Sequence, residues 1–207
     1  MDSSDYKEFL MNVTVCILAG GKGSRLNGAD KGLVVVNNKP LVEHCINRIK
    51  DQTKNITINA NRNLKKYKTY NLEVFTDLEP ESIGPLGGIQ SALEKINTDY
   101  ICFVPCDCPL LPGDLIQRLS QPLITDNFDL SIVSVKGKYQ PTFFMAKRSL
   151  NMGLKGFIAN SGRKIMHWVR QTNFTSVEFS NSDEFMNLNT ESEIEKFTML
   201  IGGKSPI

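Results

Sequence analysis

Histidine and closely paired cysteines are scarce in this chain, and their scarcity excludes the common zinc sites. The 207 residues include only two histidines, His44 and His167, and none of the five cysteines forms a C-x-x-C pair. Structural zinc sites need Cys and His ligands at short, regular spacing, so none is expected here. The odd number of cysteines, and the three that lie in or beside residues 100–105, predict buried free thiols in a reducing compartment.

Neither sign of charge dominates the composition. Lys and Arg together number 24, Asp and Glu number 22, and the formal net charge is +2. Nucleic-acid binding depends on a strongly basic surface, so we do not expect a nucleic-acid partner. Hydrophobic residues make up 41% of the chain and charged residues 22%, which is typical of a globular protein and disfavours a disordered chain or a coiled coil.

Long apolar runs are also absent. The longest, residues 100–105, is far shorter than the about 20 residues of a membrane-spanning helix. Residues 1–12 are acidic and polar, without the basic and apolar regions of a secretory signal. We therefore expect a soluble cytoplasmic protein with no membrane partner.

What the chain does contain is a regular alternation of strand-like and helix-like segments. The predicted strands are residues 13–18, 55–60, 72–76, 100–105, 130–135, 142–146 and 176–179. Helices are predicted after residue 40, over residues 89–96, after residue 112, over residues 164–169 and after residue 190. This order predicts an α/β fold of three layers: a mainly parallel twisted sheet with helices on both faces. A single domain is expected over residues 13–200, with flexible termini at 1–12 and 201–207.

Two local signals refine this expectation. Residues 136–138 (Lys-Gly-Lys) separate two strands as a turn would, which predicts a hairpin or an antiparallel excursion in the sheet. Thr190 and Glu193 have the spacing of a capping box, in which each side chain bonds the other residue's backbone N–H and so begins a helix.

A glycine-rich basic loop follows the first predicted strand. Residues 20–28 contain four glycines, at 20, 21, 23 and 28, and Lys22, Arg25 and Lys31 add positive charge to the same segment. Glycines let backbone N–H groups approach anionic oxygens, and the cations favour a triphosphate ligand. The loop is not a Walker A motif, because the string G-x-x-x-x-G-K-[ST] does not occur. It is not a dinucleotide fingerprint either, because Leu26 stands where the third glycine of G-x-G-x-x-G should be. The alternative interpretation is a tight surface turn.

Asp107 follows the buried strand of residues 100–105. A carboxylate at that position needs a compensating charge. A Mg²⁺ ion bridging triphosphate oxygens would supply it, since Mg²⁺ uses only one or two protein carboxylates. The alternative is an ordinary turn or helix-capping aspartate.

Other polar residues follow neighbouring strands. Asn59 and Asp77 come at the ends of two predicted strands, and residues 84–88 (Gly-Pro-Leu-Gly-Gly) offer a second close-approach loop. Amides and carboxylates can bind a nucleobase or ribose. Asn187 and Asn189 precede the last helix, where Thr190 could equally act as a simple cap. Each feature alone predicts a turn, but parallel strands place their carboxyl ends at one sheet edge, where ligands bind.

No Ser/His/Asp or Cys/His arrangement suggests covalent catalysis. The chain instead favours metal-assisted phosphoryl or nucleotidyl transfer.

Together these motifs resemble the molybdenum cofactor guanylyltransferase (MobA) family of nucleotidyltransferases. The strings that match its pattern, in order, are Leu18-Ala19-Gly20-Gly21, Asp30-Lys31-Gly32-Leu33, Asn38-Lys39-Pro40-Leu41, Asn59-Ala60-Asn61-Arg62, Gly84-Pro85-Leu86-Gly87-Gly88, Pro105-Cys106-Asp107-Cys108-Pro109 and Asn187-Leu188-Asn189-Thr190. The family usually has a small hydroxyl residue at position 108, where this chain has Cys108.

The resemblance implies a Rossmann-like nucleotidyltransferase that transfers GMP from Mg-GTP to molybdopterin and releases pyrophosphate. It implies GTP contacts by Leu18, Ala19, Gly20, Gly21, Lys31, Asn59, Asp77 and Asp107. It further implies Mg²⁺ on Asp107, catalytic roles for Arg25, Lys31 and Asp107, and a pterin side formed by Asn187 and Asn189. Transient contact with proteins that deliver molybdopterin, or with molybdoenzymes, is compatible with such a role. The rival interpretations are a CTP-using or sugar-phosphate-using transferase and a catalytically silent nucleotide-binding regulator.

Overall fold

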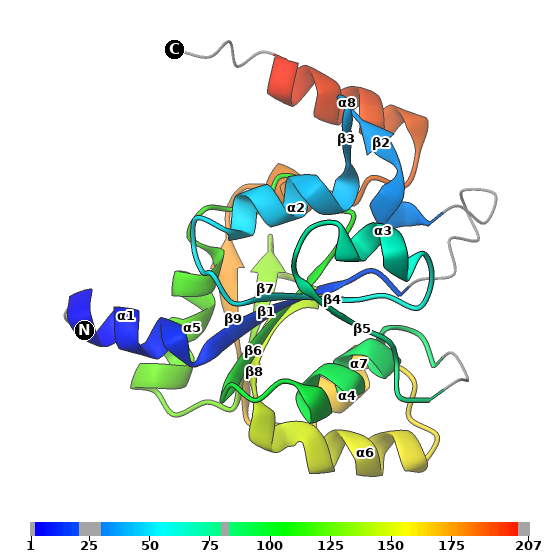
Figure 1. The fold of residues 1–207 in the computed structure, drawn as a ribbon. Helices are drawn as coiled ribbons and strands as arrows, with labels where there is room; N and C mark the ends of the chain where they lie inside the picture. The colour runs from blue at the N-terminus through cyan, green and yellow to red at the C-terminus, as the bar shows by residue number, and fades with distance from the viewer. Residues whose placement is uncertain (1–2, 21–29, 80–82, 203–207) are drawn as a thin grey trace.

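A computed structural model describes residues 3–20, 30–79 and 83–202 of the chain (Figure 1). One seven-stranded sheet forms its centre, with the order β5-β4-β1-β6-β8-β7-β9. The strands of this sheet are β1 (Val13–Leu18), β4 (Ile56–Asn59), β5 (Glu73–Phe75), β6 (Tyr100–Pro105), β7 (Leu130–Val135), β8 (Lys138–Lys147) and β9 (Phe174–Phe179). The pairs β1–β4, β1–β6, β4–β5 and β7–β9 are parallel, whereas β8 runs antiparallel to both β6 and β7. The prediction of a mainly parallel sheet is confirmed.

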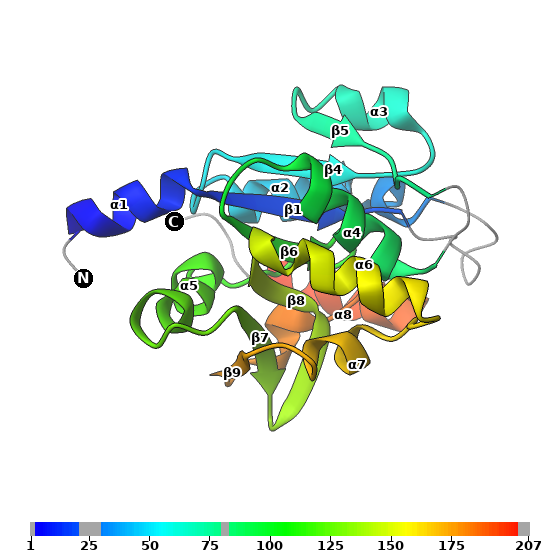
Figure 2. The same cartoon turned by 90° about the horizontal axis from the view of Figure 1, so that it is seen from below.

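Helices lie on both faces of the sheet, as the sequence predicted (Figures 1 and 2). The α-helices are α1 (Ser3–Met11), α2 (Leu41–Ile49), α3 (Leu64–Lys68), α4 (Pro85–Lys95), α5 (Leu115–Thr125), α6 (Asn151–Ala159), α7 (Ile165–Val169) and α8 (Glu191–Gly202). Three short 3-10 helices are η1 (Lys31–Leu33), η2 (Arg148–Leu150) and η3 (Ser182–Phe185). A separate antiparallel pair is formed by β2 (Val35–Val36) and β3 (Lys39–Pro40).

The two faces of the sheet carry two separate apolar cores. Successive side chains of a strand point to opposite faces. On β1, Val15 and Ile17 join the core under α2 and α5, whereas Cys16 joins the core under α4, α6 and α7. Strand β6 alternates in the same way, and both strands are buried on both sides, as central parallel strands usually are. The central strands and their carboxyl ends are thereby held in fixed register.

The predicted hairpin joins β7 to β8. Val135 pairs with Lys138, which leaves a two-residue turn of Lys136 and Gly137. Both turn residues have positive φ, 51° and 73°, which is the conformation that the right-handed twist of a tight hairpin requires. This hairpin produces the antiparallel part of the sheet.

Helix α8 begins with the predicted capping box. The Thr190 hydroxyl accepts the backbone N–H of Glu193 at 3.3 Å, and the Glu193 carboxylate accepts the backbone N–H of Thr190 at 2.8 Å. The helix buries Phe197 in a small third core with Val36 and Leu41, above β2 and β3. The segment that precedes α8 is consequently held against the rest of the fold.

The N-terminal segment, whose predicted flexibility stays a prediction, contains a helix that was not predicted. Residues 3–11 form helix α1. The Phe9 ring lies 4.7 Å from that of Tyr100, and the Tyr100 N–H donates to the Asn12 carbonyl at 3.1 Å. These contacts tie the end of the helix to the start of β6. At the other end, α8 extends to Gly202, and residues 203–207 lie outside the described residues.

Smaller differences concern other helices. Helices α3 and α6 were not predicted, and α5 begins at Leu115, three residues after Pro112. None of the helices in the described ranges is both long and apolar enough to cross a membrane.

Candidate active site

A cavity of about 440 Å³ lies at the carboxyl ends of the central strands. The register of the sheet places Leu18 of β1 beside Asn59 of β4 and beside Pro105 of β6, so the three strands end at the same level. The predicted site residues that line this cavity are Leu18, Ala19, Gly20, Lys31, Asn59, Asp77 and Asp107. The structure therefore brings together residues that the sequence could only place at separate strand ends.

Lys31 and Asp107 form an ion pair at one end of this cavity. Asp107 lies two residues beyond β6, and Lys31 begins η1. The Lys31 ammonium donates to the Asp107 carboxylate and also to the side-chain oxygen of Asn189. The Asp107 side chain is only 9% exposed and that of Lys31 24%. A nearly buried carboxylate is thus neutralised by a partly exposed cation.

The segment before α8 supplies Asn189 to this group. The Leu188 N–H donates to the Asp107 backbone carbonyl at 2.9 Å, which fixes the segment beside the turn after β6. One oxygen of the Glu193 carboxylate accepts the backbone N–H groups of Asn189 and Thr190, at 2.7 and 2.8 Å, and the Thr190 hydroxyl at 3.0 Å. The first turn of α8 therefore positions Asn189.

The same hydrogen bonds affect the ionisation of Glu193. Partial burial raises the pKa of its carboxyl, but the bonds from Asn189 and Thr190 stabilise the carboxylate and outweigh this effect. The pKa of Glu193 consequently lies below its usual value, and the cap is charged at neutral pH. Glu193 was predicted only as a helix cap, because its link to Asn189 requires the tertiary structure.

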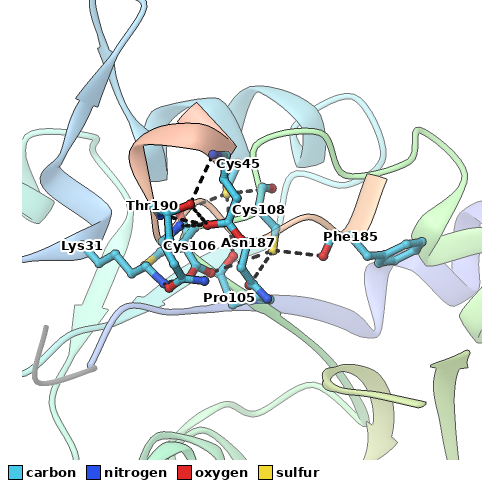
Figure 3. A network of polar contacts seen from close by, with 11 residues as sticks. Lys31, Cys45, Pro105, Cys106, Cys108, Phe185, Asn187 and Thr190 are labelled. Carbon is cyan, nitrogen blue, oxygen red and sulfur yellow. Dashed lines mark hydrogen bonds and ion pairs between the residues drawn. The ribbon is translucent and has the colours of Figure 1, made fainter. Parts of the chain in front are cut away.

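Asn187 has a different environment from Asn189. Its side-chain oxygen accepts the Cys108 thiol at 2.9 Å (Figure 3). Neither asparagine belongs to the lining of the cavity. Burial raises the pKa of Cys108 well above its usual value, so the thiol keeps the proton that it donates. Cys108 thus offers a hydrogen-bond donor to Asn187. The pterin-side role of Asn187 and Asn189 stays a prediction.

The cysteines around Asp107 are buried, as predicted. All five are free and buried, and Cys45 Sγ lies 3.3 Å from the backbone carbonyl oxygens of both Cys106 and Cys108 (Figure 3). Burial raises the pKa of Cys45 and Cys106, which disfavours thiolate nucleophiles here. These thiols support the turn that presents Asp107.

At the other end of the cavity, Asp77 is held by two asparagines. Asn59 donates to one oxygen of its carboxylate and Asn61 donates to the other, each at 2.9 Å. The Asp77 N–H in turn donates to the side-chain oxygen of Asn61 at 2.9 Å. Asn61 belongs to the Asn59–Arg62 string, but the resemblance implied a GTP contact for Asn59 alone, and the link from Asn61 to Asp77 requires the tertiary structure.

The first turn of α4 leaves room for this cluster. A Cβ atom on Gly88 would lie 2.3 Å from Asn59 Oδ1, and one on Gly87 would lie 2.8 Å from Asp77 Oδ2. Gly84, at φ 70° and ψ −153°, has a backbone conformation that is nearly restricted to glycine. Gly87 and Gly88 thus pack closely against the Asp77 and Asn59 side chains, and a close approach of residues 84–88 to a ligand stays a prediction.

Lys31 is oriented by its neighbours in sequence. The Asp30 carboxylate accepts the Tyr67 hydroxyl at 2.5 Å and the Asn63 amide at 3.0 Å. Burial raises the pKa of Tyr67, which keeps the phenol protonated as a donor. A Cβ atom on Gly32 would lie 2.5 Å from the Tyr67 hydroxyl oxygen, so a glycine is required there. Tyr67 was missed by sequence reasoning, because α3 gave no clear helical signal.

The residues of the Lys31 group fit a magnesium ion. The Asp107 carboxylate and the Asn189 side-chain oxygen both face one cation, the Lys31 ammonium. Such hard oxygen donors suit Mg²⁺, which is usually held by one or two carboxylates together with substrate phosphates. Across the described part of the chain, no group of three or more His, Cys, Asp or Glu forms a separate metal site. A Mg²⁺ ion here would therefore depend on the nucleotide for its remaining ligands.

Two predicted residues lie outside the described residues. Gly21 and Arg25 are among residues 21–29, which the structure does not describe. Their expected contacts with GTP and with the transition state stay predictions.

Comparison with known proteins places this geometry in a family. Residues 15–173 match the model of the MobA-like NTP transferase domain. A molybdenum cofactor guanylyltransferase of Shewanella pealeana is 40% identical over 182 residues, which cover 87% of this chain and 91% of that protein. One of Photobacterium profundum is 42% identical over 182 residues, covering 87% and 93%.

Solved structures share the fold. The molybdopterin-guanine dinucleotide biosynthesis protein A of Archaeoglobus fulgidus superposes with a TM-score of 0.78 at 20% identity, covering 92% of this chain and all of that one. A CMP:2-keto-3-deoxy-manno-octonic acid synthetase, complexed with CTP, gives 0.73 at 14% identity and covers 92% and 98%. At such low identities these likenesses concern the fold alone. On the domain match and the relatives in Shewanella and Photobacterium, the chain belongs to the family of MobA-like NTP transferases.

Proposed function

We propose that this chain transfers GMP from GTP to molybdopterin and releases pyrophosphate. The names of its 36–42% identical relatives support this activity, because the relatives and this chain match over most of their lengths. The observation that carries the proposal is that two pairs of side chains line the same cavity: Lys31–Asp107 at one end and Asn59–Asp77 at the other. These ends would bind the triphosphate and the nucleoside.

The Asp77 carboxylate favours guanine over the other bases. Each of its oxygens accepts one asparagine amide, and a carboxylate oxygen has a second lone pair to offer. Guanine presents two adjacent donors, N1–H and the 2-amino group, which match such a pair of acceptors. Cytosine and adenine present one donor beside an acceptor, which would face a carboxylate oxygen. This complementarity supports GTP rather than CTP as the donor substrate.

Lys31 and Gly20 would receive the triphosphate. In the structure the Lys31 ammonium pairs with Asp107 and Asn189, and it lies on the cavity wall, where phosphate oxygens would become its new partners. Leu18, Ala19 and Gly20 line the same cavity. We propose that Asp107 and Asn189 hold Mg²⁺, which when bound would polarise the triphosphate and neutralise its charge.

The transfer step follows from these positions. A terminal phosphate oxygen of molybdopterin forms a bond to the α-phosphorus of GTP. The bond from the α-phosphorus to the oxygen that bridges to the β-phosphate breaks, and pyrophosphate leaves with that electron pair. A phosphate monoester is already an anionic nucleophile, so the step needs no general base. Lys31 and, in our proposal, Arg25 stabilise the negative charge that develops on the transferring group.

The acceptor would approach from the side of the segment before α8. The Asn189 side-chain oxygen accepts a hydrogen bond from Lys31, and that of Asn187 accepts one from Cys108. Both asparagines therefore adjoin the Lys31 end of the cavity, where the triphosphate would bind. We propose that their amides contact the pterin or its phosphate. We also propose a cytoplasmic location, which the five buried free thiols support because thiols persist in reducing compartments.

The experiment that tests the proposal is the Asp107→Asn variant. This change keeps the shape of the side chain and removes its charge, so we expect GTP still to bind while Mg²⁺-dependent transfer to molybdopterin falls about 100-fold or more. The matched control is Asp114→Asn, because the Asp114 carboxylate is 53% exposed and lies outside the cavity. Transfer by the Asp107 variant at the rate of the unchanged protein would contradict the proposal, and an unfolded variant would indicate a structural role.

A further inference from the structure

The reciprocal pair of Asn61 and Asp77 suggests a role for Asn61 that its position at the surface does not reveal. Asn61 is exposed and does not belong to the cavity lining. It nevertheless makes two hydrogen bonds to Asp77: its amide donates to Oδ2 and its oxygen accepts the Asp77 backbone N–H, both at 2.9 Å. Asn61 is therefore linked to the cavity through Asp77, which lines it.

These two bonds fix the plane of the Asp77 carboxylate. The terminal torsion of an aspartate side chain is broad, so an unconstrained carboxylate can turn its oxygens through a wide range. Asn59 holds Oδ1, and Asn61 holds both Oδ2 and the backbone from which the side chain extends. The free lone pairs of the two oxygens are thereby presented in one orientation, as two adjacent donors of a ligand would require.

The surrounding backbone is shaped for this arrangement. A Cβ atom on Gly20 would lie 3.0 Å from Asn61 Nδ2 and 3.2 Å from Asn59 Oδ1. A Cβ atom on Gly87 would lie 2.8 Å from Asp77 Oδ2. Gly20, after β1, and Gly87, in the first turn of α4, thus make room for one asparagine–aspartate–asparagine cluster. Close packing of this kind leaves little freedom for the carboxylate to turn while both amides remain bonded.

We propose that Asn61 is a positioning residue that sets the selectivity for guanine by fixing the orientation of Asp77. The inference rests on the proposed function, because it takes GTP as the nucleotide substrate. Without Asn61, Oδ2 loses its amide partner and the carboxylate turns toward water. The nucleotide then keeps its triphosphate contacts at the other end of the cavity but loses a well-directed acceptor for its 2-amino group.

The test compares GTP with ITP, whose base lacks only the 2-amino group, and with CTP. Dissociation constants are measured by calorimetry without an acceptor. We expect the unchanged protein to bind GTP about ten-fold or more tightly than ITP, the factor for one hydrogen bond to a charged group. In Asn61→Ala that preference should fall to about two-fold, with little change in the affinity for ITP. Asn173→Ala is the matched control: it removes one exposed amide that donates to the Asn127 carbonyl, at the start of β9.

A second variant distinguishes loss of the positioning role from loss of folding. Asn61→Ser introduces a hydroxyl that can accept the Asp77 N–H, but this shorter side chain does not reach Asp77 Oδ2 as the amide does. We therefore expect an intermediate preference for GTP over ITP and an unchanged melting temperature. An unchanged GTP-to-ITP ratio in both folded variants would overturn the inference, as would an equal loss of affinity for the two nucleotides. If the unchanged protein prefers CTP to GTP, the guanine assignment itself fails, which is distinct from a failure of the role of Asn61.

Discussion

Replacing Lys31 by methionine removes the ammonium that lies between Asp107 and Asn189 while keeping most of the aliphatic side chain. The Asp107 carboxylate, 9% exposed, is then left without its cation. If Lys31 serves as the counter-charge of the site, the protein should lose stability, and a divalent metal should restore part of it.

The size of the loss follows from burial. Breaking a fully buried ion pair by removing one partner costs about 3–5 kcal/mol. Lys31 is 24% exposed and Asp107 borders a cavity, so water screens part of the unpaired charge and we expect a loss of about 2 kcal/mol. For a chain of 207 residues, this corresponds to a melting temperature lower by about 4–8 °C.

The assay is thermal unfolding with and without Mg²⁺, in the absence of nucleotide. Mg²⁺ should raise the melting temperature of Lys31→Met more than that of the unchanged protein, because in the variant the two oxygens no longer share an ammonium. Lys155→Met is the matched control, since it removes an exposed ion pair with Glu94 (2.6 Å) away from the cavity. The reasoning is refuted if Lys31→Met is as stable as the unchanged protein and gains no more from the metal.

Two further variants probe the supports of the site. Gly88→Ala places a Cβ atom 2.3 Å from Asn59 Oδ1, so we expect about ten-fold weaker GTP binding, whereas Gly113→Ala, with nothing within 4 Å, should bind normally. Glu193→Ala should lower the free energy of unfolding by about 1 kcal/mol, because α8 loses its cap, and should slow transfer. Glu195→Ala, on the same helix, is the control. Because folding lowers the pKa of Glu193, its contribution is present above its usual pKa, 4.5, and is lost as the pH falls through the lower folded value. Circular dichroism against pH should show this loss in the unchanged protein and not in Glu193→Ala, and equal acid profiles would contradict it.

The sequence predicted the sheet and most of the site because both depend on local patterns. Buried strands such as residues 13–18 and 100–105 appear as continuous apolar runs, and parallel strands end at one edge. The residues that follow them, among them Asn59 and Asp107, could therefore be predicted to lie at one edge of the sheet. Glycine and proline marked the loops between them for steric reasons.

What the sequence could not predict are contacts between distant segments. The bond from Lys31 to Asn189 joins residues 158 positions apart, and the bonds from Asn61 to Asp77 depend on how β4 and β5 align. Helix α1 was missed because its polar composition resembles that of a free terminus, and its support comes from Tyr100. Such features follow from tertiary packing rather than from periodicity.

The most direct measurement is a transfer reaction with purified protein, Mg²⁺, molybdopterin and, in parallel, each of the four nucleoside triphosphates labelled at the α-phosphate. A guanylyltransferase moves label to the pterin from GTP alone and releases pyrophosphate in equal amount. Transfer from CTP instead would contradict the guanine assignment and the role given to Asp77. Bound GTP with no transfer from any nucleotide would contradict the enzymatic function and indicate a nucleotide-binding regulator.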